Sequence, residues 1–227
     1  MAAPAFDNFS SVSDNDGDTV MAWTHTVNSN TNGILMVGVL SGLGIAISSV
    51  KYATVSMTEV TNSPAINGNM KVHLFYLLLP ATGANTVEVT MASNTRFKEA
   101  GATSWTGVNQ TTPLGTWNEN GGTSATATVD ITSAVDEIVL DVVGVRFLTT
   151  DADQTIAVGA GQTERWNVKV GFMTSDKFRC GGSSEAGAAT VTMSWAVGSS
   201  ASRDWAIGGV PIKPLAAIAA RRAFVIS

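Results

Sequence analysis

The sequence is poor in the residues from which catalytic sites and disulfide frameworks are built. It contains one cysteine, Cys180, and two histidines, His25 and His73, so an intrachain disulfide is excluded. Charged residues make up 14% of the chain, against about 25% in a typical soluble domain, and Thr, Ser, Asn and Gly take their place. A surface of hydroxyls and amides suits a protein that partners cover. The lack of disulfides indicates folding in a reducing cytoplasm.

Basic clusters and long apolar runs are also missing. The net charge is −5 and no segment is rich in Lys or Arg, whereas nucleic-acid binding needs a basic surface. The longest apolar runs, such as Ile34 to Leu40, are far shorter than the roughly 20 residues that span a bilayer. The first residues have neither the basic start nor the apolar core of a signal peptide. We therefore expect no nucleic-acid partner, no membrane association and no export.

No sequence motif nominates a catalytic site. There is no Gly-x-Ser-x-Gly elbow, no phosphate loop and no His/Cys cluster with metal spacing. His25 and His73 lie within strand-like segments, where histidines usually pack across strands, and Cys180 lies in Cys-Gly-Gly-Ser-Ser, which is typical of a loop. The sequence predicts that the protein is not an enzyme. A glycosidase built on its scattered carboxylates is the remaining catalytic alternative.

What the sequence does contain is a series of short β-branched and aromatic runs between turn residues. Val20 to Val27 alternates between two faces, and Ile34 to Leu40 has the pattern of a strand buried on both faces. Further strands are predicted at Ile45 to Tyr52, Val55 to Val60, Lys71 to Leu79, Thr86 to Met91, Thr103 to Val108, Ala125 to Ile131, Glu137 to Val145, Gln154 to Val158, Arg165 to Met173, Ala189 to Val197 and Asp204 to Ile212. The pattern predicts an all-β fold, a two-sheet antiparallel β-sandwich that is jelly-roll-like. No segment repeats at a fixed period.

Arms are predicted on both sides of a single sandwich domain at 19–213. Residues 1–18 are polar and rich in Ser and Asp, and we expect an arm that lies on the surface or is ordered by a neighbour. Residues 214–227 follow a strand-ending Pro-Ile-Lys-Pro and form the other arm. A short helical face with a basic end is predicted from Leu215, Ile218, Arg221, Arg222 and Phe224. This segment either packs on its own sandwich or binds another subunit.

The one candidate metal site is Asp14-Asn15-Asp16-Gly17-Asp18. Alternate carboxylates on a tight glycine turn can converge on a hard cation, so Asp14, Asp16 and Asp18 are candidate Ca²⁺ ligands. His25 stands where the closing glutamate of an EF-hand would be, and the alternative is an acidic turn without an ion. No other cofactor is predicted.

Two tryptophans are candidate contact residues. Trp117 lies in a polar stretch with Asn118 and Glu119, and Trp105 precedes Thr-Gly-Val-Asn-Gln. Exposed aromatics beside amides and carboxylates form both glycan-binding surfaces and protein hot spots. The alternative is that each indole packs against its own loop or core.

Five segments taken together resemble a family of proteins. They are Trp23–Val27, Ile34–Val39, Leu74–Pro80, Ala81–Val87 and Gly107–Gly115. In this order they are similar to a diffuse group of β-sandwich structural proteins of tailed bacteriophages and bacterial surfaces, over roughly residues 19–212. The resemblance implies a virion component, either a capsid decoration (cement) protein or a tail-associated module. It implies no active-site residue.

The leading hypothesis is therefore a capsid decoration protein made in the host cytoplasm. Its expected partners are the major capsid protein or other virion proteins, with copies of itself on the particle, and both arms are expected to make the inter-subunit contacts. The alternative is a carbohydrate-binding β-sandwich module of a phage tail or cell-surface protein.

Overall fold

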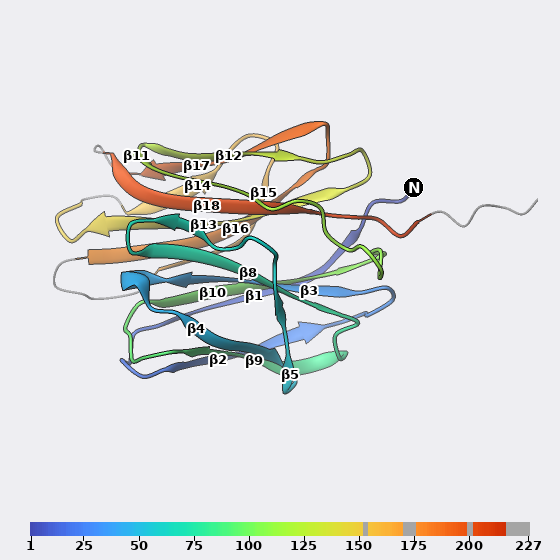
Figure 1. Cartoon of the computed structure of the whole chain (residues 1–227), viewed down its shortest axis with the longest axis horizontal. Coiled ribbons are helices and arrows are strands. Elements are labelled where there is room, and N and C mark those ends of the chain that lie inside the picture. Colours follow the sequence, from blue (N-terminus) through green and yellow to red (C-terminus); the bar gives the residue numbers. More distant parts are fainter. Residues whose placement is uncertain (152–153, 170–175, 199–201, 217–227) are drawn as a thin grey trace, which may run out of the picture.

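The computed structural model describes residues 1–151, 154–169, 176–198 and 202–216. Strands dominate this part of the chain, with one short 3₁₀ turn at Gly42–Gly44. The predicted all-β antiparallel sandwich is confirmed, but the described strands form four sheets rather than two. The sheets lie on one another as four layers (Figure 1). Among the described residues, no helix has the length and apolarity needed to cross a bilayer.

The first half of the chain forms two of these layers. Its inner sheet has the order β1-β10-β3-β8-β6, with β7 also paired to β8, and its outer sheet has the order β2-β9-β4-β5. The bounds are β1 Ala5–Asp14, β2 Val20–Val27, β3 Ile34–Ser41, β4 Ile47–Tyr52, β5 Val55–Ser56, β6 Thr58–Glu59, β7 Ala65–Asn67, β8 Met70–Leu78, β9 Gly83–Met91 and β10 Lys98–Thr106.

The second half forms the other two layers. Its inner sheet has the order β11-β18-β13-β16-β15, and its outer sheet has the order β12-β17-β14. The bounds are β11 Asn118–Ser124, β12 Thr126–Thr132, β13 Ile138–Leu148, β14 Thr155–Val158, β15 Thr163–Lys169, β16 Asp176–Ala186, β17 Thr190–Gly198 and β18 Arg203–Ile212.

The two halves repeat one strand order. The inner order β1-β10-β3-β8 corresponds to β11-β18-β13-β16, and the outer order β2-β9-β4 corresponds to β12-β17-β14. The sequence has no repeat of fixed period, so this internal repeat is one of topology. It follows that the chain contains two sandwiches with the same connections between strands.

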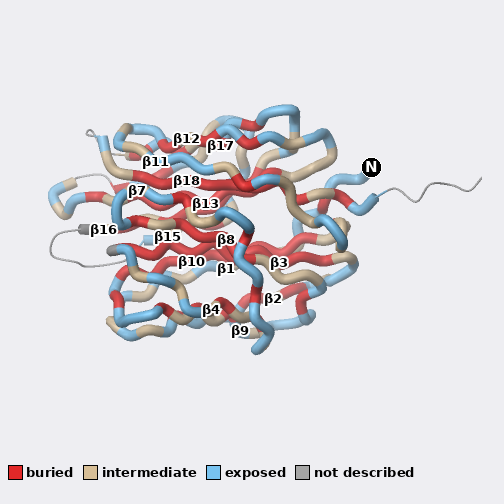
Figure 2. The backbone as a smooth tube through the Cα atoms, viewed as in Figure 1, coloured by how far each residue is buried: buried red, intermediate tan, exposed pale blue. Residues whose placement is uncertain are grey.

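The inner sheets of the two halves pack face to face and share a central core. In this contact β3 lies on β13, β8 lies on β18, and β10 lies on β16. Because β8 corresponds to β16 and β18 to β10, the last two contacts are equivalent, as in an interface between two symmetry-related subunits. Both inner layers are consequently buried on two sides (Figure 2). Strand β3 is buried along its whole length, as its continuous apolar run predicts.

The inner sheets pack closely because tryptophan rings lie directly against glycine residues, which have no side chain. The Trp166 indole of β15 lies against Gly38 of β3, Gly101 of β10 and Gly182 of β16, and a Cβ atom at Gly101 would lie 2.0 Å from the Trp166 ring. The same arrangement recurs in the second half, where Trp117 covers Gly208. Only glycine leaves room for a ring so close to the backbone.

Several sequence predictions need correction here. Residues 1–18 do not form a free arm, because Ala5–Asp14 is strand β1 and pairs along its length with β10. Cys-Gly-Gly-Ser-Ser is not a loop but the middle of β16. The glycine-rich Asn120-Gly121-Gly122, for which no strand was predicted, lies within β11. In β16, Gly181 faces the Trp195 ring and Gly182 faces the Trp166 ring. In β11, Gly122 faces the Trp205 ring and Gly121 faces the Ile66 carbonyl.

Candidate functional site

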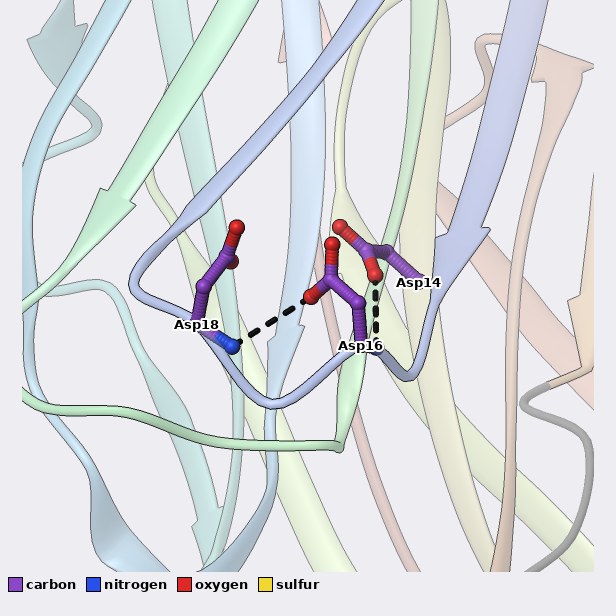
Figure 3. Close-up of side chains that lie close together, drawn as sticks. All are labelled: Asp14, Asp16 and Asp18. Atoms are coloured by element: carbon purple, nitrogen blue, oxygen red, sulfur yellow. Dashed lines mark hydrogen bonds between the residues drawn. The ribbon is translucent and has the colours of Figure 1, made fainter.

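The predicted cation-binding residues do converge, in the loop that joins β1 to β2 (Figure 3). The loop turns at Gly17, whose φ is +84°. The backbone N–H of Asp16 donates to Asp14 Oδ1 at 3.0 Å, and that of Asp18 donates to Asp16 Oδ1 at 3.3 Å. One oxygen of each of the three carboxylates lies within 4.8 Å of the others.

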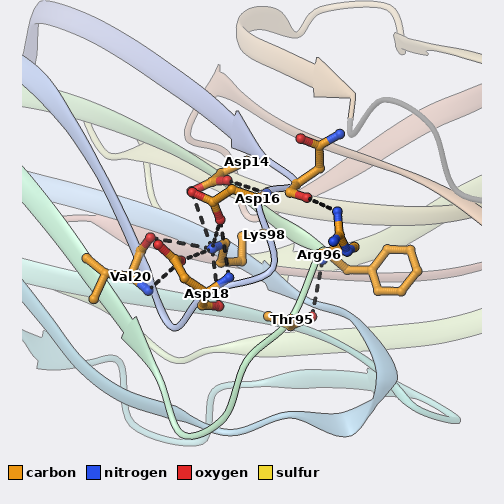
Figure 4. Close-up of polar contacts among 9 residues, drawn as sticks. Asp14, Asp16, Asp18, Val20, Thr95, Arg96 and Lys98 are labelled. Atoms are coloured by element: carbon orange, nitrogen blue, oxygen red, sulfur yellow. Dashed lines mark hydrogen bonds and ion pairs between the residues drawn. The ribbon is translucent and has the colours of Figure 1, made fainter.

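The ammonium group of Lys98 lies among these carboxylates (Figure 4). Its Nζ is 2.8 Å from Asp16 Oδ1 and 3.3 Å from Asp14 Oδ2, and it also pairs with Asp18. Lys98 begins β10 directly opposite Asp14 of β1, and its side chain is fully buried. The chain thus supplies its own cation at the point where the oxygens converge.

Lys98 and Asp16 keep their opposite charges across the neutral pH range. Burial lowers the pKa of Lys98, but hydrogen bonds with Asp16 and Asp18 outweigh burial, and the net result is a raised pKa. The hydrogen bond from Lys98 lowers the pKa of Asp16 to about 2. A Ca²⁺ ion on these oxygens would have to displace the ammonium group. The geometry therefore supports a structural role for the cluster, and Ca²⁺ binding stays a prediction.

The segment before β10 holds the same loop from a second side. The backbone N–H of Thr95 donates to the Asp18 carbonyl at 3.1 Å, and Arg96 Nη1 donates to the Asn15 carbonyl at 3.0 Å (Figure 4). Ion pairs and backbone hydrogen bonds thus fix the β1–β2 loop against the start of β10.

One cluster has the order of a hydrolase relay, but it is closed to substrate. Glu59 Oε1 lies 2.8 Å from His73 Nδ1, and His73 Nε2 lies 3.5 Å from Ser41 Oγ. A carboxylate, imidazole and hydroxyl in this order can activate a serine. Ser41, however, has no exposed surface, and burial lowers the pKa of His73. Because no substrate atom can reach Ser41 in this structure, the cluster is a buried polar contact.

His25 is a neutral hydrogen-bonding group in the core between the inner and outer sheets of the first half, which we call the first outer core. Its Nδ1 lies 2.9 Å from Ser10 Oγ and its Nε2 lies 3.2 Å from Ser104 Oγ. Burial lowers the pKa of His25 to about 4, against a smaller opposing effect of Asp7. The predicted cross-strand packing of this residue is confirmed, since the partners come from β1 and β10.

Asp141 is the corresponding ionisable group in the second half. Its Oδ1 accepts from the Ser183 backbone N–H at 2.7 Å and from Ser183 Oγ at 2.8 Å, while Oδ2 accepts from Trp195 Nε1 at 2.7 Å. Burial raises the pKa of Asp141 to about 6 in spite of these bonds. Its three donors all belong to β16 and β17 of the same half, so Asp141 joins the sheets of the second sandwich.

Cys180 lies in the central core. It is fully buried on β16, and burial raises the pKa of its thiol well above the ordinary value. A nucleophilic cysteine needs a thiolate and access to solvent, and Cys180 has neither.

The candidate contact tryptophans are not on the surface. Trp105 is 2% exposed and Trp117 is 5% exposed, and both belong to the central core between the inner sheets. Of their predicted companions, Glu119 is exposed, and Asn118 donates to the Asp130 carbonyl at 2.9 Å. The prediction of an exposed aromatic contact surface at Trp105 and Trp117 is therefore wrong. Trp117 lies on the backbone of Gly208, and Trp105 packs against the Phe6 ring and donates to Thr103 Oγ1.

Only part of the predicted C-terminal contact segment lies within the described residues. Leu215 is exposed, and its backbone N–H donates to the Gly107 carbonyl at 2.8 Å. Ile218, Arg221, Arg222 and Phe224 lie outside the described residues.

A groove with a volume of about 340 Å³ lies between the halves, beside the turn from β7 to β8. Arg146 and Asp204 line it and pair with each other at 3.5 Å. The Asn67 amide, also in its lining, donates to the carbonyls of Gly122 and Trp205. These polar side chains bond to other groups of the protein, and the Asn67 bonds connect the two halves. The described lining residues therefore show no set of polar groups directed at a ligand.

No known protein family, curated protein or solved structure matches the chain. The resemblance to phage structural proteins therefore stays a prediction that rests on the sequence segments alone.

Sequence reasoning located the three aspartates but missed Lys98. The missing signal is register: only the antiparallel pairing of β1 with β10 places Lys98 opposite Asp14. Asp141 was missed for the same reason, because its donors lie more than forty residues away along the chain.

Proposed function

We propose that this protein is a non-catalytic structural protein of a bacteriophage particle, and that it decorates the capsid surface. The phage assignment rests on the sequence resemblance. The strand order also supports reading each half as a jelly roll, an architecture common in viral capsid proteins.

The single observation that most directly supports an assembly role is the outward face of the second outer sheet. Strand β12 alternates buried Ala127, Val129 and Ile131 with outward residues, and β17 follows the same alternation. The outward side chains of this strand pair are Thr126, Thr128, Asp130, Thr132, Thr190, Thr192, Ser194 and Ala196. Asp130 carries the one charge among them, and it accepts a hydrogen bond from Thr192 Oγ1 at 2.6 Å.

Such a face is well suited to being covered. Threonine loses less side-chain entropy on burial than lysine or glutamate, so fewer unfavourable terms oppose association. Hydroxyl groups can bond to a partner backbone without the cost of burying a charge. A stable contact needs roughly 800 Å² from each partner. We propose that this face meets the major capsid protein or another virion protein, while copies of the protein surround one another on the particle.

The proposal is tested first by immunogold electron microscopy on phage particles from the source lysate, with an antibody raised against the protein. Label distributed over the heads is the expected result. Label on tails, or particles without label, would overturn the capsid assignment.

The face itself is tested by Thr132→Lys with Thr192→Lys, which adds two charges to exposed positions and should leave the fold intact. Thr24→Lys, at an exposed position on the first outer sheet, is the matched control. We expect the double variant to lose particle binding at least tenfold in a co-sedimentation assay and the control to bind normally. Equal binding of both variants would exclude this face.

A further inference from the structure

Side-chain amides of β11 bond to one edge of β12. Among the described strands, β12 pairs only with β17, so the carbonyl groups along its other edge need other donors. Asn118 Nδ2 donates to the Asp130 carbonyl at 2.9 Å, and Asn120 Nδ2 donates to the Thr128 carbonyl at 2.8 Å. The asparagines of β11 thus join the inner sheet of the second half to its outer sheet.

The Asn120 side chain is also bonded to the backbone that follows it. The Gly121 N–H donates to Asn120 Oδ1 at 2.9 Å, so the Gly121 nitrogen lies beside Cγ, the carbon atom that carries Oδ1. Because both ends of the amide are bonded, the side chain is held in this conformation, at an exposed position of β11. Holding two reacting groups next to each other accelerates the reaction between them. The reaction that joins this nitrogen to this carbon is the first step of asparagine deamidation.

The residue that follows Asn120 leaves this attack unhindered. A side chain on the attacking residue obstructs the approach of its nitrogen, and Gly121 has none. Packing requires glycine at this position, because a Cβ atom on Gly121 would lie 2.8 Å from the Ile66 carbonyl oxygen of the first half. The contact between the halves therefore demands the residue that also favours the reaction.

The first half contains the same hydrogen bonds without the glycine. In β1, Asn8 Nδ2 donates to the Thr26 carbonyl of β2 at 2.8 Å, and the Phe9 N–H donates to Asn8 Oδ1 at 2.9 Å. The internal repeat thus places Asn8 as Asn120 is placed, but with a phenylalanine as the attacking residue. Asn8 is a natural control for the contribution of glycine.

The other Asn-Gly pairs of the chain have the glycine without this geometry. They are Asn32-Gly33 and Asn67-Gly68. The Gly33 N–H donates to the Asn30 carbonyl at 2.9 Å, away from the Asn32 side chain. The Asn67 amide donates to two carbonyls of the second half at 2.8 and 3.1 Å, which directs it across the interface. Among the described residues, Asn120 alone combines the glycine with a nitrogen placed beside Cγ.

We propose that Asn120 is a site of spontaneous covalent modification, at which the side-chain amide is converted to a carboxylate. Hydroxide from solvent takes the proton of the Gly121 N–H, and the nitrogen forms a bond to Asn120 Cγ. The bond from Cγ to Nδ2 then breaks, and Nδ2 leaves as ammonia with a proton from water. The product is a cyclic imide, which water opens at either of its two carbonyl carbons to give aspartate or isoaspartate. The net reaction consumes one water molecule and releases ammonia.

The modification changes the contact between β11 and β12. A carboxylate only accepts hydrogen bonds, so the bond to the Thr128 carbonyl is lost and a negative charge lies beside that oxygen. Isoaspartate also adds a backbone carbon atom to β11, which disturbs its register with β18. Older molecules therefore lose part of the link between the sheets of the second half. This inference goes beyond the proposed function and does not depend on it.

The test is peptide mapping by mass spectrometry on the full chain, sampled over weeks in mildly alkaline buffer. We expect Asn120 to convert about tenfold or more faster than Asn8, Asn32 and Asn67. In urea the three Asn-Gly pairs should convert at similar rates, because the folded geometry that separates them is gone. Asn120→Gln is the matched control: its longer side chain does not form the same ring, so the fast conversion should disappear while the other sites keep their rates.

A second variant adds the missing element to the first half. Phe9 is 53% exposed, so Phe9→Gly should fold, and it should raise the conversion rate of Asn8 to about that of Asn120. Three results would overturn the proposal. They are conversion of Asn32 or Asn67 as fast as that of Asn120 in the folded chain, slower conversion of Asn120 in the folded chain than in urea, and an unchanged rate at Asn8 in folded Phe9→Gly.

Discussion

The two halves share a strand order, yet they fix the corresponding loops by different chemistry. In the first half, the buried ammonium group of Lys98 binds three aspartates around the β1–β2 loop. In the second half, Trp205 near the start of β18 donates its indole N–H to Ser124 Oγ, at the end of β11 just before the turn to β12, at 2.9 Å. One topology therefore accepts either an ion cluster or a neutral hydrogen bond at the same place. The connections of the strands do not dictate the chemistry of the loops.

The outer cores differ in a parallel way. Each contains a buried ionisable group whose pKa differs from its ordinary value by about 2 or more, His25 in the first half and Asp141 in the second. Burial disfavours the charged form of both groups, so it lowers the pKa of His25 and raises the pKa of Asp141. The same physical cause gives the halves opposite responses to acid.

The largest effect is expected at the core that the halves share. Trp166→Ala should lower the free energy of unfolding by about 3–5 kcal/mol, because it leaves a cavity between the inner sheets. We expect scanning calorimetry to resolve two transitions in place of one, since the halves lose a large side chain of the core that they share. A single transition at lower temperature would show instead that the halves unfold together without Trp166.

Gly101→Ala gives a matched test of the same slot. The added methyl group would lie 2.0 Å from the Trp166 ring, so the variant should also be strongly destabilised. In the Trp166→Ala background the clash is removed, and Gly101→Ala should cost much less. If the two substitutions changed the free energy of unfolding additively, the close contact between Trp166 and Gly101 would be contradicted.

The next effect is the pH dependence of the two outer cores. The pKa of His25 is about 4 when folded and 6.5 ordinarily, so acidification from pH 6.5 to 4 should remove about 3 kcal/mol of stability. The pKa of Asp141 is about 6 when folded and 3.8 ordinarily. Its contribution is present at low pH, and about 3 kcal/mol is lost as pH rises from 3.8 to 6. The two terms nearly cancel in the whole chain.

Single substitutions should separate these terms. In His25→Asn the stability from urea unfolding should rise on acidification between pH 6.5 and 4 relative to the unsubstituted protein, because the effect of His25 no longer opposes that of Asp141. The lowered pKa of His73 still opposes that rise in both proteins. In Asp141→Asn the stability should decrease over the same range. The quantity to compare is the slope of the unfolding free energy against pH. Its absolute value is not informative, because either substitution also removes hydrogen bonds and so changes the stability at every pH. Wild-type slopes in both variants would contradict the assignment.

The smallest effects concern the two loops. Lys98→Met leaves Asp14, Asp16 and Asp18 without their cation, so Tm should fall by several degrees, and millimolar Ca²⁺ should restore part of the loss. Trp205→Phe removes one neutral hydrogen bond and should cost about 1 kcal/mol, with no response to Ca²⁺. A Lys98→Met protein that does not respond to Ca²⁺ would show that the carboxylates cannot hold the ion.

Much of the strand pattern could be predicted from the sequence, because alternation and apolar runs report burial directly. Val20–Val27 agrees residue for residue with β2, and β3 and β8 agree within one residue at each end. Apart from the three-residue β7, the strands that were missed are of two kinds. β1 is polar because it is an edge strand, and β11 and β16 contain glycines that usually mark turns.

The internal repeat and the site chemistry could not be predicted, since both depend on long-range pairing. The glycines of β16 look like a loop until Trp166 and Trp195 are placed over them. Trp105 and Trp117 were expected at the surface because their neighbours in sequence are polar. Their packing partners lie far away in sequence, the Phe6 ring for Trp105 and the Gly208 backbone for Trp117.

The face-to-face contact of the inner sheets has a consequence for how the molecule can vary. In a symmetric pair of identical chains, every substitution appears twice, and any new loop must be tolerated in both subunits. Here both members of the pair belong to one chain, so a change appears once. The acidic loop with its lysine exists in the first half alone, and the partner half keeps a short neutral turn. Because the two halves are linked in one chain, they pack on each other as the subunits of a dimer do. Their loops can nevertheless differ, because each half has its own sequence.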